Sequence, residues 1–465
     1  MCSRRKSLSC PPALNSLQLL QDPLTLTPEQ LQKISNNDLE EMERFASYKV
    51  GGYMPVTLKQ EFGPNKEYKI IRKLGWGTFS TVWLTKDKSK QGKFYALKIL
   101  ISSTMGKTAA LREIEVLKRI KATDPSDIGY SRLLLYHTYF TEKSVNGRHV
   151  CVVNEAMGKS LLDLINQSNC QGLDQQGVKS IIRQVVEGLK YLQKCRVIHT
   201  DIKLENILVS VKDSYLFNMA AYVKQFDRNC ISVPKSYIST LEWVYRDESG
   251  DQGNCSETDS SLESITFYDD YTLNKPSKQT QQSLLFLDPN IQIKIADFGC
   301  AIFEGRPYLS RTHPTANRAL ELIIESPCSF PLDMWSIGCL AFELSTGDSL
   351  FGLNNSENVG AEEWQLQSIW KVNNGISKHV ALSGRKSFLF FDSEGNLKHP
   401  PKKSSKSQKI QYQLVKTYGW KEEDALIFED FILSLVEPDP AVRATASAVL
   451  SKTWLKEKQQ IHSKN

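Results

Sequence analysis

Apolar and polar residues alternate along the first part of the chain, from Tyr68 onward. Three short runs, YKIIRKLG, STVWLTKD and KFYALKIL, are separated by glycine or charged turns and predict three antiparallel strands. Apolar residues at helical spacing predict a helix over residues 109–120, and two more strands are predicted around Leu133 and over residues 149–154. The pattern therefore predicts a small antiparallel β-sheet lobe with one helix.

After Gly158 the apolar spacing becomes helical. One stripe consists of Ile181, Ile182, Val185, Val186, Leu189 and Leu192. Helical patterns return over residues 332–344, 364–370 and 425–435, after an apolar strand in IQIKIADFG. The second lobe is therefore larger and mainly helical, so that the chain is an α+β protein of two lobes.

Composition divides the chain further. Residues 211–290 are rich in Ser, Asp, Asn and Gln, and we expect a largely disordered spacer insert, because they bury too little apolar surface to offset the entropy of ordering. The stretch HPPKKSSKSQK predicts an exposed basic loop. The segments are an N-terminal extension (1–67), the first lobe (68–157), the second lobe in two parts (158–210 and 291–456) around the spacer (211–290), and a C-terminal tail (457–465).

Length and charge narrow the class of protein. The 465 residues suffice for two lobes with extensions, and 58 Lys and Arg against 52 Asp and Glu give a formal charge of +6, too diffuse to indicate a nucleic-acid partner. The ten cysteines form no C-x-x-C pair, which is typical of reduced thiols. The start, MCSRRKSLSCPPALNSLQLL, lacks the long apolar region typical of a signal peptide, and no later stretch reaches about 18 apolar residues. We expect a soluble, intracellular monomer without a membrane or nucleic-acid partner.

A glycine-rich turn joins the first two predicted strands. Its sequence is Gly75-Trp76-Gly77-Thr78-Phe79-Ser80-Thr81-Val82, in which glycines let backbone N–H groups approach phosphates. This signal alone is weak, because an ordinary glycine-rich hairpin has the same composition and Ser80 stands where a third glycine is usual. The residues that follow decide between the two interpretations.

A lysine on the next strand fits phosphate binding. Tyr95-Ala96-Leu97-Lys98 matches the V-A-I-K pattern, which places an ammonium against the α- and β-phosphates of a nucleotide, although a lone strand lysine is usually a surface residue. Glu113 on the following helix can turn inward to hold Lys98, whereas Glu115 lies off the apolar stripe and should face water. We therefore predict the pair Lys98–Glu113.

The most specific signal is His199-Thr200-Asp201-Ile202-Lys203-Leu204-Glu205-Asn206, which precedes an apolar strand. Asp201 is expected to orient the substrate hydroxyl, Lys203 to stabilise the transferring phosphate, and Asn206 to ligate Mg²⁺ through its amide oxygen. Asp297-Phe298-Gly299 follows another strand and supplies the second metal ligand, Asp297. Together these groups predict phosphoryl transfer from ATP with Mg²⁺.

Two further segments resemble structural anchors of protein kinases. Ala319-Leu320-Glu321 stands where kinases have A-P-E, and the resemblance implies a buried ion pair of Glu321 with Arg443, which would otherwise be a surface charge. Asp333, at the start of a long apolar helix, should hold the catalytic loop, and Phe298 should pack beneath the helix of Glu113.

Several segments resemble the SR-protein kinases, which phosphorylate serines in arginine-serine repeats of splicing factors. They are GGYMPVTL, LGWGTFSTVWL, HTDIKLENIL and AFELSTGDSLF, and the long insert between Asn206 and Asp297 is another family trait. The resemblance implies a bilobal protein kinase fold, arginine-serine-rich splicing factors as substrates and partners, regulation of mRNA splicing, and a location in cytoplasm and nucleus. The ATP site that it implies consists of Leu74, Gly75, Trp76, Gly77, Thr78, Phe79, Ser80, Thr81, Val82, Ala96, Lys98, Glu155, Met157 and Leu208.

Arginine-rich substrates require an acidic docking surface, to which Glu362 and Glu363 can contribute. A basic pocket for phosphoserines already made can be lined by Arg318 and Lys378. An ordinary solvated surface charge is an equally good interpretation for each of these side chains.

Thr200 replaces the Arg of H-R-D that in most protein kinases meets a phosphorylated activation loop. Its absence suggests activity without such phosphorylation, and the resemblance implies the same.

The chain departs from the family at several positions. Pro314-Thr315-Ala316-Asn317-Arg318-Ala319 replaces T-R-Q-Y-R-S, which leaves the substrate preference open. Asn154 stands where a bulky apolar residue precedes the hinge, Leu204 replaces a proline, and Cys300 stands where Asn is more usual. None of these changes removes a phosphate, metal or proton-handling group, so we expect an active enzyme.

Two other functions stay open. The lost Arg at Thr315 favours a related kinase with a non-RS substrate, and the spacer and basic loop would suit a pseudokinase scaffold that binds partners. Intact Lys98, Asp201, Asn206 and Asp297 argue against the scaffold.

Overall fold

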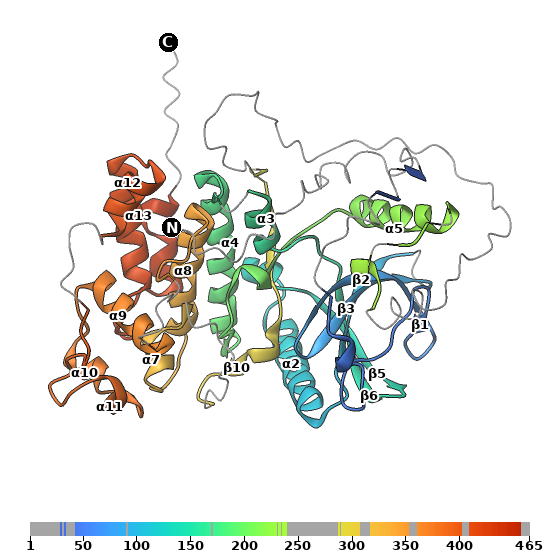
Figure 1. Ribbon diagram of the computed structural model, residues 1–465, viewed down its shortest axis with the longest axis horizontal. Helices are drawn as coiled ribbons and strands as arrows, with labels where there is room; N and C mark the ends of the chain where they lie inside the picture. Colours follow the sequence, from blue (N-terminus) through green and yellow to red (C-terminus); the bar gives the residue numbers. More distant parts are fainter. Residues whose placement is uncertain are drawn as a thin grey trace, which may run out of the picture.

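The chain folds into a β-sheet lobe and a larger, mainly helical lobe, as predicted (Figure 1). The computed structural model describes residues 28–29, 32–33, 42–89, 92–168, 171–229, 231–233, 235–239, 287–288, 290–306, 317–352, 360–401 and 409–456. Several predicted features lie outside the described residues, namely spacer residues 240–286, most of the basic loop (402–408), Thr315 and the C-terminal tail.

The smaller lobe is an antiparallel sheet with one long helix against it. The strands are β1 (Glu61–Phe62), β2 (Tyr68–Gly77), β3 (Ser80–Asp87), β4 (Phe94–Leu100), β5 (Tyr136–Ser144) and β6 (Gly147–Glu155), in the order β1-β2-β3-β4-β6-β5. Helix α2 (Thr104–Thr123) begins at Ser103, whose side chain accepts a hydrogen bond from the Gly106 N–H and so caps the helix. The strand predicted around Leu133 begins three residues later, at Tyr136.

The two faces of this sheet have different neighbours. Side chains alternate along a strand, so Leu97 and Ile99 of β4 point to the face that we call the outer face, and Lys98 points to the inner face. Met54 and Val56, from the chain before β1, pack on the outer face in one core cluster with Leu97 and Ile99. The predicted N-terminal extension therefore supplies part of the lobe's own core.

Two buried helices form the centre of the larger lobe, α4 (Gln175–Lys194) and α8 (Pro331–Thr346). Every residue of the predicted α4 stripe is buried. The other elements of this lobe are α3 (Leu161–Gln167), β7 (Val197–Ile198), β8 (Ile207–Val209), β9 (Ile293–Ile295), β10 (Ile302–Phe303), α7 (Leu320–Ile323), α9 (Ala361–Asn373), α10 (Lys378–Ala381), α11 (Ser387–Phe390), α12 (Ile410–Tyr418), α13 (Glu422–Leu435) and α14 (Ala446–Leu450). Among the described residues, no helix is long and apolar enough to cross a membrane.

Two short antiparallel strand pairs, β7–β10 and β8–β9, carry the predicted catalytic segments. In the second pair Ile207 lies opposite Ile295, and the Ala296 N–H donates to the carbonyl of Asn206 over 2.8 Å. This register brings Asn206 beside the start of the D-F-G segment, although the whole spacer separates them in sequence.

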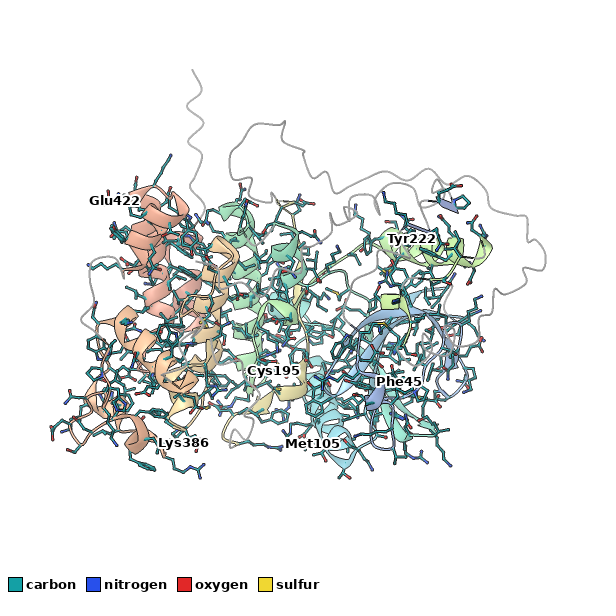
Figure 2. All side chains as sticks on the ribbon, in the orientation of Figure 1. Phe45, Met105, Cys195, Tyr222, Lys386 and Glu422 are labelled. Carbon is teal, nitrogen blue, oxygen red and sulfur yellow. The ribbon has the colours of Figure 1, made fainter. Side chains whose placement is uncertain are left out.

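The first part of the predicted spacer is a helix, α5 (Asp213–Arg228), which lies on the small lobe (Figure 1). Leu216 packs against Leu84, and the fully buried Phe226 packs in a cluster with Tyr222 and Tyr237 (Figure 2 labels Tyr222). The prediction of a disordered spacer is wrong for this segment. Its apolar residues, at positions 216, 220 and 223, lie on one helical face although the surrounding composition is polar.

We predict that Phe226→Ala lowers the free energy of unfolding by about 3–5 kcal/mol, because it opens a cavity in a fully buried cluster. Phe217→Ala, on the same helix, should cost less, since the Phe217 side chain is 44% exposed. Urea unfolding followed by tryptophan fluorescence measures both. Equal costs would contradict the assignment of α5 to the folded lobe.

Candidate active site

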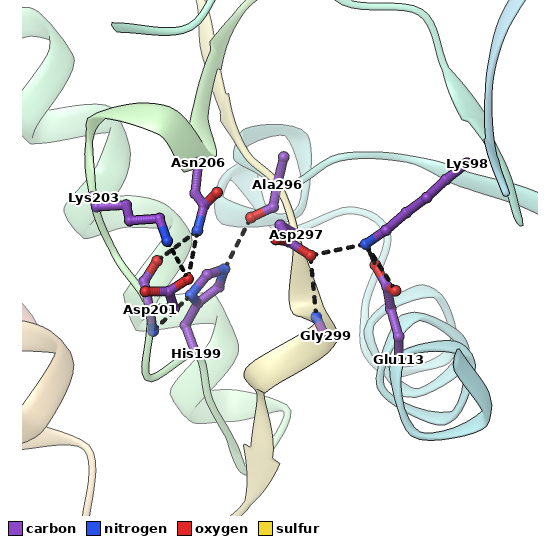
Figure 3. A network of polar contacts seen from close by, with 9 residues as sticks. All are labelled: Lys98, Glu113, His199, Asp201, Lys203, Asn206, Ala296, Asp297 and Gly299. Carbon is purple, nitrogen blue, oxygen red and sulfur yellow. Dashed lines mark hydrogen bonds and ion pairs between the residues drawn. The ribbon is translucent and has the colours of Figure 1, made fainter. Parts of the chain in front are cut away.

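Three charged side chains from different elements meet on the inner face of the sheet (Figure 3). The ammonium of Lys98 on β4 lies 2.8 and 2.9 Å from the two carboxylate oxygens of Glu113 on α2, and 2.8 Å from Asp297 Oδ1. Glu115 instead faces the surface, where its carboxylate lies 3.7 Å from Arg306. The lysine is therefore paired with Glu113 and not with Glu115.

The charges in this group stabilise one another. Burial alone would lower the pKa of Lys98, but Asp297 and Glu113 together raise it above its usual value. The Lys98 ammonium lowers the pKa of Asp297 to about 2, against the opposing effect of burial. Burial raises the pKa of Glu113, and Lys98 opposes that shift. At neutral pH Lys98 is thus a cation, and Asp297 is a carboxylate.

A second cluster lies on the loop between β7 and β8 (Figure 3). Lys203 Nζ donates to Asp201 Oδ2 over 2.7 Å, and Asn206 Nδ2 donates to the same oxygen over 3.0 Å. Asn206 Nδ2 also donates to the Asp201 carbonyl over 2.9 Å. Because these contacts use the amide nitrogen, the Oδ1 of Asn206 points away from Asp201, which is the orientation that a metal ligand requires.

Histidine and phenylalanine rings join this loop to the D-F-G segment. His199 Nε2 lies 3.1 Å from the Ala296 carbonyl and donates to it, which leaves Nδ1 to accept from the Asp201 N–H over 3.3 Å. The Phe298 ring is buried, with its centroid 5.1 Å from that of His199. The 3₁₀ turn of Phe298 also packs against α2, the helix of Glu113, as expected.

Asp333, at the start of α8, holds the backbone of the catalytic loop. Its two oxygens accept hydrogen bonds from the N–H groups of His199 and Thr200, each over 2.8 Å. Thr200 has a φ of 69°, an unfavourable left-handed conformation for a β-branched residue, and these bonds fix it there. The Thr200 hydroxyl donates to the Cys300 carbonyl over 3.0 Å. Thr200, which stands where most kinases have Arg, is thus bonded to the residue after the D-F-G segment, and this contact requires no phosphate group on the activation loop.

The glycine-rich turn leaves room for a ligand. A Cβ added at Gly75 or Gly77 would meet no atom within 4 Å, so the backbone of the turn borders open space. Ala96 lies on the same inner face as Lys98, and Val82 is paired with Lys98 across β3 and β4. These residues fit a nucleotide whose phosphates lie between the turn and Lys98.

Not every residue of the predicted ATP site points its side chain into this space. Trp76 and Thr81 are paired on the outer face, and the Thr81 hydroxyl accepts from the Trp83 indole N–H. The Glu155 carboxylate is engaged by Lys294 over 2.7 Å. Only backbone atoms of these residues would face a nucleotide. Of the other predicted residues, Leu74, Gly75, Gly77, Phe79, Val82, Ala96, Lys98 and Leu208 are half-buried, Thr78 is exposed, and Ser80 and Met157 are buried.

The departures from the family have distinct surroundings. Asn154 is buried opposite Ala96, and its Oδ1 has no hydrogen-bond partner within the described part of the chain. Leu204 is buried in the main core, and Cys300 is half-buried. Sequence reasoning missed Tyr53, whose hydroxyl donates to the Gly77 carbonyl over 2.7 Å. A spacing rule cannot find such a contact, because the two residues share no motif.

The predicted ion pair of Glu321 and Arg443 is confirmed. The guanidinium binds both carboxylate oxygens, over 2.7 and 3.0 Å, and both side chains are almost fully buried. Arg443 also donates to the Pro331 carbonyl over 2.8 Å and lies over the ring of Trp335. The pair therefore joins α7, α8 and the segment before α14.

Each side chain predicted to recognise the substrate has a partner of opposite charge or a histidine. Arg318 Nη1 lies 2.9 Å from Glu362, and Glu363 lies 2.5 Å from His399 Nδ1. Lys378 pairs with Glu394 over 2.7 Å at the surface. In the free protein Arg318 and Lys378 are thus each paired with a carboxylate, and Glu363 contacts a histidine.

Known proteins are similar to this chain over most of its length. The protein kinase domain family model matches residues 68–242 and 281–455, which include every side chain of the two clusters. The chain is 32% identical to SRSF protein kinase 3 of Mus musculus, over 97% of each sequence. It is 31% identical to serine/threonine-protein kinase spk-1 of Caenorhabditis elegans, over 94% of this chain and 52% of that one. Its identity to protein kinase dsk1 of Schizosaccharomyces pombe is 29%, over 89% and 85%.

We predict that Glu113→Gln lowers the rate of phosphate transfer by about 10²-fold, because Lys98 loses the partner that holds it in place. Glu115→Gln is the matched control and should change the rate little, since Glu115 is exposed. Initial rates with radiolabelled ATP compare the two variants. Similar rates for both would show that the observed pairing has no catalytic role.

We predict that Arg443→Ala lowers the free energy of unfolding by about 3–5 kcal/mol, because it leaves the buried Glu321 carboxylate without its partner. Lys452→Ala breaks the more exposed pair with Asp430 and should cost at most about 1 kcal/mol. Urea unfolding measures both, and a small effect at Arg443 would refute this anchor.

Proposed function

Since this chain belongs to the protein kinase family and, within it, to the SR-protein kinases, we propose that it phosphorylates serines in arginine-serine repeats of splicing factors. The observation that carries the proposal is the complete set of charged and polar groups at one site, Lys98 with Glu113 and Asp297, and Asp201 with Lys203 and Asn206. Phosphoryl transfer requires these groups, because it depends mainly on positioning and on neutralising negative charge.

Protein kinases use ATP and a divalent metal, and we take the metal of this enzyme to be Mg²⁺. When bound, Mg-ATP supplies the γ-phosphoryl group and the metal charge that partly neutralises it. The Asn206 amide oxygen and the Asp297 carboxylate are the groups of this site that would hold Mg²⁺, since this ion prefers oxygen ligands. Lys98 would bind phosphate oxygens as a cation.

In this reaction Asp201 would receive the substrate hydroxyl. Lys203 and Asn206 both donate to its Oδ2, which leaves Oδ1 to orient the serine hydroxyl and accept its proton. Lys203, held 2.7 Å from Asp201, would neutralise charge on the phosphoryl group as it moves. Asp201 would thus act on the serine hydroxyl, and Lys203 would act on the phosphoryl group that this hydroxyl receives.

The pairing of Arg318 with Glu362 supports an arginine-rich, partly phosphorylated substrate. The Glu362 side chain is 41% exposed, so a substrate arginine can reach its carboxylate. A substrate arginine would bind the Glu362 carboxylate, and the adjacent Arg318 guanidinium would attract a phosphoserine made in an earlier turnover. The pair would then recognise both charges of the repeat.

The hydrogen bond from Thr200 to Cys300 supports activity without activation-loop phosphorylation, because it joins the catalytic loop to the D-F-G segment by itself. The proposal includes a role in mRNA processing and a location in both cytoplasm and nucleus, where splicing factors are made and used.

Phosphate transfer from radiolabelled Mg-ATP to an arginine-serine repeat protein tests the proposal. We expect strong labelling that is lost in Asp201→Ala, because this variant removes the acceptor of the hydroxyl proton. An acidic generic protein serves as the comparison substrate. Labelling of the generic protein alone would indicate a kinase with a non-RS substrate, and no Asp201-dependent labelling of either would indicate a scaffold.

A further inference from the structure

Residues 43–53 form a segment before the sheet that reaches the glycine-rich turn. None of its side chains has a role in the reaction proposed for the site. Gly51 has a φ of 85°, and a Cβ on Gly52 would lie 2.0 Å from the Ser47 carbonyl oxygen, so this bend requires glycine at both positions. Tyr53 follows the bend. It is buried, and its hydroxyl donates to the Gly77 carbonyl over 2.7 Å.

Further contacts fix Tyr53 in this place. Asn146 Nδ2 donates to the Tyr53 carbonyl over 2.7 Å, and the Tyr48 ring meets the Tyr53 ring edge-on, with centroids 5.6 Å apart. The Tyr48 hydroxyl donates to Glu43 over 2.5 Å, and Glu43 forms a buried ion pair of 2.7 Å with Lys73 on β2. The segment is therefore attached both to the middle of β2 and to the turn at its end.

The contact with Gly77 sets the direction of one backbone N–H. The Gly77 carbonyl and the Thr78 N–H belong to one trans peptide, in which they point in opposite directions. The segment that carries Tyr53 lies on the outer side of the sheet, since the next residue, Met54, packs on the outer face. Holding the carbonyl on that side turns the Thr78 N–H toward the inner face, where Lys98 lies.

We propose that Tyr53 is a positioning residue for nucleotide phosphates, which keeps the Thr78 N–H directed at the phosphate site by holding the Gly77 carbonyl. The inference rests on the proposed function, because it concerns the same ATP site. Burial, with the nearby Glu43 carboxylate, raises the pKa of Tyr53, so its hydroxyl keeps its proton at neutral pH. Backbone N–H groups are suitable phosphate donors, and their value depends on their being held in place before the ligand arrives.

The substitution Tyr53→Phe tests this proposal, because it removes one hydroxyl and keeps the ring. Affinity for ATP should fall about fivefold, as expected for the loss of one hydrogen bond, and the KM for ATP should rise by a similar factor. Affinity for adenosine, which carries no phosphate, should not change. Titration calorimetry with ATP and with adenosine compares the two ligands on the same protein.

Tyr48→Phe is the matched control, since it keeps the ring that contacts Tyr53 and the Glu43–Lys73 ion pair and removes only a hydroxyl that bonds Glu43 and not the turn. Both affinities should stay at the wild-type value, and a thermal melt shows that each variant is folded. Unchanged ATP affinity in Tyr53→Phe, or an equal loss of ATP and adenosine affinity, would overturn the inference. A wild type that binds ATP but transfers no phosphate would instead overturn the proposed function, and the binding comparison would still decide the role of Tyr53.

Discussion

The contact of one ammonium with two carboxylates is the interaction on which the site depends. Glu113 comes from the helix of the small lobe, and Asp297 comes from the segment after β9 in the large lobe. The two carboxylates would repel each other without Lys98 between them. The three-way contact can form only when α2, the sheet and the D-F-G segment have one relative arrangement. The relative position of the two lobes therefore decides whether the reacting groups are in place.

Supporting contacts reach this group from both lobes. On the large-lobe side, Asp333 fixes the backbone of His199 and Thr200, and His199 in turn binds the carbonyl next to Asp297. On the small-lobe side, the chain before β1 covers the outer face of the sheet that carries Lys98. Thus residues with no chemical role hold the reacting groups within hydrogen-bonding distance of one another.

The sequence predicted those parts of the fold that depend on short, periodic or motif-bound patterns. The α4 stripe and the choice of Glu113 over Glu115 followed from helical spacing, because burial selects one face of a helix. Helix α5 was missed because its few apolar residues lie in a polar region. The overall composition of a segment does not show whether its apolar residues lie on one face of a helix. The contact of Tyr53 with Gly77 could not be predicted, because it joins residues that are neighbours only after the sheet has formed.

Helix α5 changes the way in which the two lobes are connected. The chain crosses between the lobes once after β6 and again after β8, since α5 returns to the small lobe. The two crossings lie side by side, where the Gly158 N–H donates to the Val209 carbonyl over 2.8 Å and the Val209 N–H donates to the Lys159 carbonyl over 2.9 Å. A movement of one lobe relative to the other must bend these two hydrogen-bonded connections together, so they should be stiffer than a single connection and should restrict twisting between the lobes.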